Sequence, residues 1–260
     1  MTQREKRIYL ISYLLGESGE YRGIDIPKSD DEQKKLLRSL MNVRMPKPVS
    51  NEFLQIQNEY LQGEISEKGI ADCRDFEFLK PGICLWQGDI TALKCDAIVN
   101  AANSQMLGCF CPCHGCIDNA IHTFAGVSLR LKCAEIMKAQ GAPEQVGRAK
   151  ITRAYNLPSK YIIHTVGPMV RGKLRRADCD ALAGCYRACL QTAAAYNLKS
   201  LAFCCVSTGE FGFPSEDAAR IAIKEVRVFM TQKTSHERVI FNVFKDEDRK
   251  IYSRLLGSNK

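Results

Sequence analysis

The spacing of apolar residues changes near residue 75 and predicts two kinds of structure along the chain. Before that point, apolar positions recur three or four residues apart, as they do on one face of a helix. Ser29 opens an acidic run typical of a helix start, and residues 45–48 carry the prolines of a stop and linker. The helical positions are Ile8, Leu10, Ile11, Leu14 and Leu15; Leu36, Leu37, Leu40 and Met41; and Phe53, Leu54, Ile56 and Leu61. We therefore predict a helical N-terminal extension over residues 1–75 that acts as a cover or a partner surface.

From residue 76 onward, short apolar and β-branched runs alternate with longer segments of helical periodicity. The predicted strands are Ile83–Gln87, Ala97–Asn100, Ala149–Tyr155, Tyr161–Val166, Leu201–Val206 and Val239–Phe244. The predicted helices are Ile117–Gln140, Asp178–Asn197, Ser215–Thr231 and Asp246–Leu256. This alternation favours an α/β layer fold with a largely parallel sheet over residues 76–260. Ligands bind beyond the carboxyl ends of the strands in such sheets, so we expect the site in the loops that follow strands.

Composition places the chain among ordinary soluble proteins. Its 260 residues are 45% hydrophobic and 25% charged, which excludes collagen-like and disordered classes. The sequence has no run of 18 apolar residues, so we expect no membrane span, and the N-terminus does not read as a signal peptide. We expect a cytoplasmic protein.

Thirteen cysteines are unusual for such a chain. The number is odd and no secretory signal precedes them, which favours free thiols in a reducing compartment. Cysteine packs as a small buried hydrophobe, and this reading covers nine of them. The other four fall within eight residues, at positions 109, 111, 113 and 116, and need a separate explanation.

The segment Ser207–Pro214 is predicted to bind phosphate. It follows a strand, contains two glycines and leads into the helix expected at Ser215. A glycine-rich loop before a helix presents unpaired backbone N–H groups and the positive end of the helix dipole. The loop matches neither a Walker A motif nor a GxGxxG fingerprint, so an ordinary strand–helix turn is the alternative.

The four clustered cysteines and His114 form a second candidate site. Thiolate and imidazole ligands in a compact loop favour zinc, and the paired CxxC spacing of a structural zinc finger is missing. Three protein ligands with an open fourth position fit better, and that arrangement is typical of catalytic zinc. Buried thiols, a redox pair and an adventitious metal are the alternatives.

Asp118 and His122 follow the cluster at the predicted start of a long helix. Asp118 could cap the helix, or could orient a water or a ribose hydroxyl beside the metal. His122 lies one turn later on the same face, and we expect it to pack or to donate a hydrogen bond, not to catalyse.

Three motifs in this order resemble those of the macrodomain family, over roughly residues 76–257. They are QGDIT at residues 87–91, DAIVNAAN at residues 96–103 and STGEFGFP at residues 207–214. The common hydrolase type has a run of glycines where this chain has GCFCPCHGC. The substitution resembles the zinc-containing branch, whose Cys-x4-His-x-Cys pattern falls on Cys109, His114 and Cys116, with Cys111 and Cys113 as additional thiols.

The resemblance implies a three-layer α/β/α sandwich with a mixed, mostly parallel sheet that binds ADP-ribose. Asp89 would accept from the adenine amino group with the Ile90 backbone beside it, and Asn103 would hold the distal ribose. The diphosphate would be wrapped by Ser207, Thr208, Gly209, Glu210 and Phe211. The distal ribose would be lined by Ile117, Asp118 and Asn119 beside the metal.

The resulting hypothesis is zinc-dependent hydrolysis of the bond that joins ADP-ribose to a protein side chain, with Asp118 and Asn103 as catalytic residues. The alternatives are a reader that binds ADP-ribose without cleaving it, and a deacetylase of O-acetyl-ADP-ribose. The family resemblance suggests a lipoyl-carrier protein as substrate and a sirtuin-type ADP-ribosyltransferase as partner. Nucleic-acid binding, suggested by the net charge of +8 and the basic residues 171–176, is less favoured because no aromatic residues interleave with those charges.

Overall fold

The computed structural model describes residues 1–21, 23–232 and 237–257. Its described residues form a six-stranded sheet in the order β2–β8–β7–β4–β6–β5. The strands are β2 Ile83–Gln87, β4 Ala97–Ala102, β5 Ala149–Arg153, β6 Tyr161–Val166, β7 Ser200–Phe203 and β8 Arg238–Val243. Neighbouring strands are parallel except β5 and β6, which are antiparallel. The predicted mixed, mostly parallel sheet is therefore confirmed.

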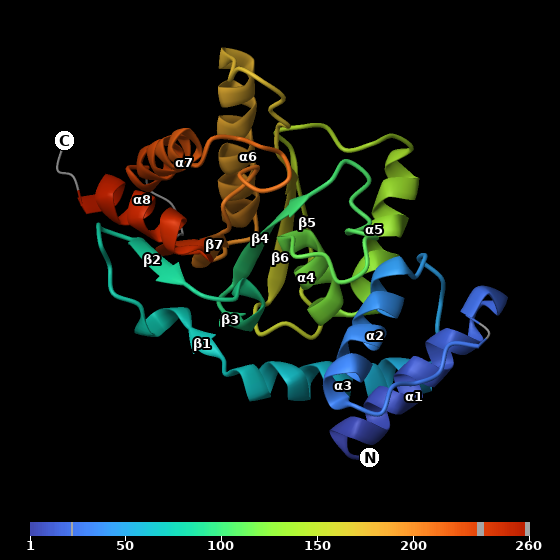
Figure 1. Ribbon diagram of the computed structural model, residues 1–260. Coiled ribbons are helices and arrows are strands. Elements are labelled where there is room, and N and C mark those ends of the chain that lie inside the picture. The colour runs from blue at the N-terminus through green and yellow to red at the C-terminus, as the bar shows by residue number, and fades with distance from the viewer. Residues whose placement is uncertain (22, 233–236, 258–260) are drawn as a thin grey trace.

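Helices cover both faces of the sheet. Helices α6 (Arg176–Ala195), α7 (Ser215–Met230) and α8 (Asp246–Gly257) pack side by side on one face, and α4 (Ile117–Ala125) and α5 (Val127–Gln140) cover the other (Figure 1). The central strands β4 and β6 are buried at almost every position, as expected for strands covered on both faces. The fold is the expected three-layer α/β/α sandwich. Among the described helices, none has the length and apolar content that crossing a membrane requires.

The first part of the chain folds as three helices, α1 (Gln3–Gly16), α2 (Asp30–Val43) and α3 (Asn51–Lys68). Each begins after a hydroxyl side chain, from Thr2, Ser29 and Ser50, that accepts a hydrogen bond from a backbone N–H in the first turn. The helices bury an apolar cluster of their own that includes Leu10, Ile11, Leu14, Leu37, Leu40, Phe53 and Leu61. The predicted helix start at Ser29 is confirmed.

The extension and the sandwich share apolar packing. Ile65 of α3 belongs to the core of the sandwich, whereas Val127 of α5 packs into the cluster of the extension. Two short strands, β1 (Ala71–Asp72) and β3 (Leu93–Lys94), pair in parallel between the two parts. The boundary at residue 75 stays a prediction, and the two parts are in extensive contact.

One predicted helix was wrong in its extent. The segment expected as Ile117–Gln140 is two helices, because the backbone of Gly126 turns to a φ of +90° between them. A Cβ at Gly126 would lie 2.6 Å from the side chain of Gln57 in α3, so this break also lets α3 approach closely. The predicted strand Ala149–Tyr155 stops at Arg153, and Tyr155 has a φ of +54° that no strand uses.

Arg130 of α5 forms hydrogen bonds that join the extension to the sandwich. Its buried guanidinium donates to the carbonyls of Met41, Asn42 and Arg44 at 2.6–3.0 Å, and its Nε donates to the carbonyl of Leu107 at 2.7 Å. Three of these carbonyls lie at the C-terminal end of α2, where a helix leaves carbonyls unpaired and favours a positive charge.

We expect Arg130→Met to lower the free energy of unfolding by roughly 3–5 kcal/mol, because it leaves buried carbonyls without donors. Urea denaturation measures the loss. Lys132→Met is the matched control on the same helix, since Lys132 is exposed and forms an ion pair with exposed Glu135. Equal stability of the two variants would contradict this account.

Candidate active site

A cavity of about 1520 Å³ lies at the carboxyl ends of the parallel strands. It is lined by residues of the loops after β2, β4, β6, β7 and β8 and by residues of helices α2, α3 and α4. It is larger than a typical small-ligand pocket of about 300–1,000 Å³. The predicted site residues that line it are Asp89, Ile90, Asn103, Cys109, His114, Cys116, Ile117, Asp118, Ser207, Thr208, Gly209, Glu210 and Phe211. Of the predicted residues, Asn119 does not line the cavity.

Asp89 lies two residues after β2, an edge strand of the sheet. Its Oδ1 accepts from the backbone N–H and the hydroxyl of Thr91 at 2.9 and 2.6 Å. Its Oδ2 accepts from Lys68 Nζ of α3 at 3.0 Å. Burial acts to raise the pKa of Asp89, but the Thr91 hydrogen bonds and the Lys68 charge outweigh it and hold the pKa below its ordinary value. Asp89 is therefore a fixed, ionised acceptor.

The loop Ser207–Pro214 follows β7, which lies between β2 and β4 in the sheet. Ser207 and Gly212 both have a positive φ, of +66° and +65°, and the loop ends where Pro214 caps α7. Within the described residues, the backbone N–H groups of residues 209–211 donate to no other group. Three successive free N–H groups in a loop that leads into a helix are available to an anion. The geometry supports the predicted phosphate-binding role.

Asp118 lies on the first turn of α4 and is 5% exposed. Asn100 Nδ2 donates to its Oδ1 at 2.8 Å, and Asn103 Nδ2 donates to its Oδ2 at 3.3 Å. Both asparagines come from β4 and the residue that follows it, so one strand fixes both carboxylate oxygens. Burial raises the pKa of Asp118 to about 6 although the Asn100 hydrogen bond opposes the shift.

Two buried histidines lie behind Asp118. His164 of β6 is opposite Asn100 in the sheet register, with its Nδ1 3.1 Å from Asn100 Nδ2 and its Nε2 2.9 Å from Thr152 Oγ1. His122 Nε2 lies 3.6 Å from Asp118 Oδ1, which is longer than a hydrogen bond. Burial lowers the pKa of both imidazoles, so they are neutral and hold no ion pair with Asp118. His122 packs behind the site, as expected.

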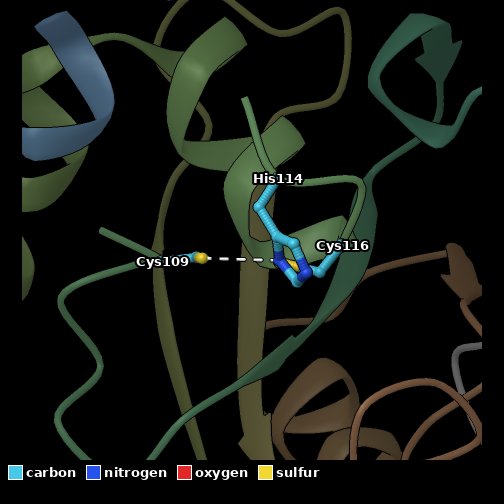
Figure 2. A group of neighbouring side chains, drawn as sticks. All are labelled: Cys109, His114 and Cys116. Atoms are coloured by element: carbon cyan, nitrogen blue, oxygen red, sulfur yellow. Dashed lines mark hydrogen bonds between the residues drawn. The ribbon is translucent and has the colours of Figure 1, made fainter. Parts of the chain in front are cut away.

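Cys109, His114 and Cys116 converge on one another (Figure 2). Asp118 lies two residues after Cys116 and lines the same cavity. Their ligand atoms all lie within 4.8 Å of one another, and Cys109 Sγ is 3.6 Å from His114 Nδ1. Two ligands of a tetrahedral zinc, at about 2.3 Å for sulfur and 2.0–2.1 Å for nitrogen, are roughly 3.5 Å apart. The donor set and this spacing fit zinc. Burial raises the pKa of the Cys116 thiol to about 12.

The other two thiols of the loop point elsewhere. Cys113 Sγ lies 3.2 Å from Ser39 Oγ and 3.4 Å from the carbonyl of Lys35, both on α2. Cys111 is exposed. Neither belongs to a described group of three close ligands, which separates them from Cys109 and Cys116.

The phosphate loop and the cysteine loop meet at His114. Its Nε2 lies 3.4 Å from Glu210 Oε1, on the side of the ring away from Cys109. A metal-binding histidine usually donates its second N–H to a carboxylate or a carbonyl, which fixes the ring. Glu210 is placed for this contact.

Comparison with known proteins identifies the family. The Macro domain family model matches residues 99–222. A protein-ADP-ribose hydrolase of Treponema medium is 53% identical over 264 residues, covering 99% of this chain and 100% of the relative. The chain belongs to the macrodomain family. A protein-ADP-ribose hydrolase of Staphylococcus aureus (strain MSSA476) is 48% identical over 246 residues, 94% of this chain and 92% of that protein.

The macrodomain also resembles solved structures. The crystal structure of a Trypanosoma brucei macrodomain in complex with ADP-ribose is 31% identical, with a TM-score of 0.66, and covers 85% of this chain and 95% of that one. The alignments with the two hydrolases extend over nearly the whole chain, so those relatives share the helical extension of this macrodomain as well as its sandwich.

Several residues of this macrodomain's site were not predicted from the sequence. Asn100 belongs to the DAIVNAAN motif, and a polar residue inside an apolar strand was a readable signal. Lys68 and Arg38 reach the site from α3 and α2, and no local pattern distinguishes them from other helical cations. Asn119 was expected to line the ribose, but its side chain is fully buried and bonds Arg38 and the carbonyl of Cys111.

Proposed function

We propose that this macrodomain is a protein-ADP-ribose hydrolase that cleaves the glycosidic bond between mono-ADP-ribose and a protein side chain, with zinc at Cys109, His114 and Cys116. The observation that carries the proposal is Asp118, a buried carboxylate held by two carboxamides beside a metal-ligand triad. The hydrolases of Treponema medium and Staphylococcus aureus support the same activity.

The order of the strands that precede these groups suits ADP-ribose, because β7 lies between β2 and β4 in the sheet. The carboxylate of Asp89 accepts from the exocyclic amino group of adenine at one end. The free N–H groups of residues 209–211 lie between and suit a diphosphate. The distal ribose then reaches Asn103 and Asp118, so its anomeric carbon lies next to the triad.

Zinc with three protein ligands and an open position lowers the pKa of a bound water, and that is the chemistry it would supply here. The chain's own residues do the rest. Asp118 accepts a proton as water attacks the anomeric carbon, and its charge stabilises the positive charge that grows on the ribose. The bond from that carbon to the protein side chain breaks, and the proton returns to the released side chain. The same proposal assigns this chain to the zinc-containing branch of the family.

A single-turnover assay tests the activity. Mono-ADP-ribosylated protein is mixed with excess enzyme, and free ADP-ribose and unmodified protein are expected together. A reader would bind the modified protein and release nothing, which would overturn the proposal. O-acetyl-ADP-ribose serves as a second substrate, and turnover of it alone would favour the deacetylase.

The path of the phosphate loop gives a further prediction. A Cβ at Gly167 would collide with the hydroxyl of Ser207, and Gly212 is held beside the carbonyl of Val170. We expect Gly167→Ala to displace Ser207 and weaken ADP-ribose binding about tenfold, or about 1.4 kcal/mol. Isothermal titration calorimetry measures this. Gly16→Ala, in open space at the end of α1, is the control, and equal affinities would contradict the predicted role of the loop.

The proposed activity and the family resemblance together suggest partners. The substrate is an ADP-ribosylated protein, and a lipoyl carrier modified by a sirtuin-type transferase in the cytoplasm is the specific proposal from family resemblance. Comparing the release rate from a modified lipoyl carrier with that from an unrelated modified protein tests it. Equal rates would remove the preference for that carrier.

A further inference from the structure

One face of helix α2 in the extension lies against the cysteine loop. Lys35 and Ser39 contact the thiol of Cys113, and Asn42 Oδ1 accepts from the backbone N–H of Cys113 at 2.9 Å. Positions 35, 38, 39 and 42 share one helix face. Cys113 has a φ of +53°, an uncommon conformation for a residue with a side chain, so this contact holds a specific loop geometry.

Arg38 makes the central contact of that face. Its Nη2 donates to the carbonyl of His114 at 2.9 Å and to Asn119 Oδ1 at 2.8 Å, and its Nε also donates to Asn119 Oδ1 at 3.2 Å. Asn119 Nδ2 in turn donates to the carbonyl of Cys111 at 2.9 Å. The guanidinium therefore hydrogen-bonds the loop directly at His114, and through Asn119 it is connected to Cys111.

The same network reaches a second metal ligand. The backbone N–H of Asn119 donates to Cys116 Sγ at 3.4 Å, where Cys116 caps α4. Arg38 thus connects to His114 through its carbonyl and to Cys116 through Asn119. A planar guanidinium holds such paired acceptors in a way that an ammonium cannot.

We propose that Arg38 is a positioning residue for the zinc ligands, and that helix α2 serves to hold the cysteine loop in its metal-binding shape. This inference rests on the proposed zinc site. Without Arg38, the loop would have to be ordered when metal binds, and that ordering cost would appear as weaker zinc binding. Arg38 lines the same cavity as Asp89 and residues 209–211, and its described hydrogen bonds go to Asn119 and to the carbonyl of His114.

The test is zinc affinity by competition with a chromophoric chelator, for the wild-type full chain, Arg38→Met, Arg38→Lys and Arg4→Met. We expect Arg38→Met to weaken zinc binding about 10–100-fold, the loss typical when a group that supports a metal ligand is removed. Arg38→Lys is expected to recover only part of the affinity. Arg4→Met removes an exposed arginine of α1 whose described contacts are with Asp30 and the carbonyl of Lys28, and it is expected to match wild type.

Two further readouts separate positioning from general destabilisation. The circular dichroism spectrum of zinc-free Arg38→Met is expected to match that of zinc-free wild type, and the visible spectrum of Co²⁺-substituted Arg38→Met is expected to differ from that of Co²⁺-substituted wild type. Should Arg38→Met fail to fold by circular dichroism, Arg38→Lys carries the test. Equal zinc affinities of wild type, Arg38→Met and Arg38→Lys would overturn this inference and leave the proposed function standing. Wild type that binds no zinc would overturn the zinc part of the proposed function as well.

Discussion

Replacing Asp118 with alanine is expected to slow the release of ADP-ribose about 10²–10⁴-fold, the usual contribution of a general base. The variant removes the proton acceptor and the negative charge beside the anomeric carbon. Binding of ADP-ribose is expected to stay within a few fold, because Asp89 and the free N–H groups of residues 209–211 are untouched. Single-turnover kinetics and calorimetry measure the two effects separately.

Asp118→Asn refines this experiment. It keeps the shape of the side chain, but places an NH₂ group against an amide donor of Asn100 or Asn103. Asp180→Asn, an exposed carboxylate on α6, is the matched control and is expected to behave as wild type. If Asp118→Ala cleaved at the wild-type rate, the base would have to be another group.

The second large effect that we expect is the loss of hydrolysis rate when zinc is removed. Chelation to a verified metal-free state should lower the hydrolysis rate about 10²–10³-fold, since activating a bound water is worth several kcal/mol. Cys109→Ser should reproduce the loss, because a hydroxyl is a poor zinc ligand compared with a thiolate. Metal content by mass spectrometry on protein purified without added zinc accompanies each rate.

Cys111→Ser is the control for that series. Cys111 is exposed, and its thiol lies outside the described ligand group, so zinc content and rate are expected to be unchanged. Loss of zinc in Cys111→Ser would show that the ligands exchange within the loop. Full activity of verified zinc-free protein would contradict a catalytic role for zinc. The proposed roles of the other site residues would stand.

The elements of the sandwich could be read from the sequence because each is a long periodic or apolar segment between turn residues. The helix break at Gly126 was visible as a glycine, but the reason for it is Gln57 of α3, 69 positions earlier in the chain. The antiparallel direction of β5 had no local signal. Strands β1 and β3 have two residues each, too few for a pattern.

The candidate site was predictable where its residues are adjacent in sequence. The triad Cys109, His114 and Cys116 and the phosphate loop are local motifs, and the structure brings both to one cavity. The contacts of Arg38 join residues 76 and 81 positions apart, and no periodicity reveals such pairs. Periodicity marked α2 as an amphipathic helix and gave no indication of which partner its polar face contacts.

The contacts between the extension and the sandwich also bear on how this chain evolves. Arg130 satisfies the last carbonyls of α2, while Asn42 of α2 bonds both the Cys113 backbone and the Thr123 hydroxyl. A change on either side therefore leaves a buried polar group unpaired on the other. The two segments should be inherited as one unit and should acquire paired substitutions, instead of being shuffled between proteins as separate modules.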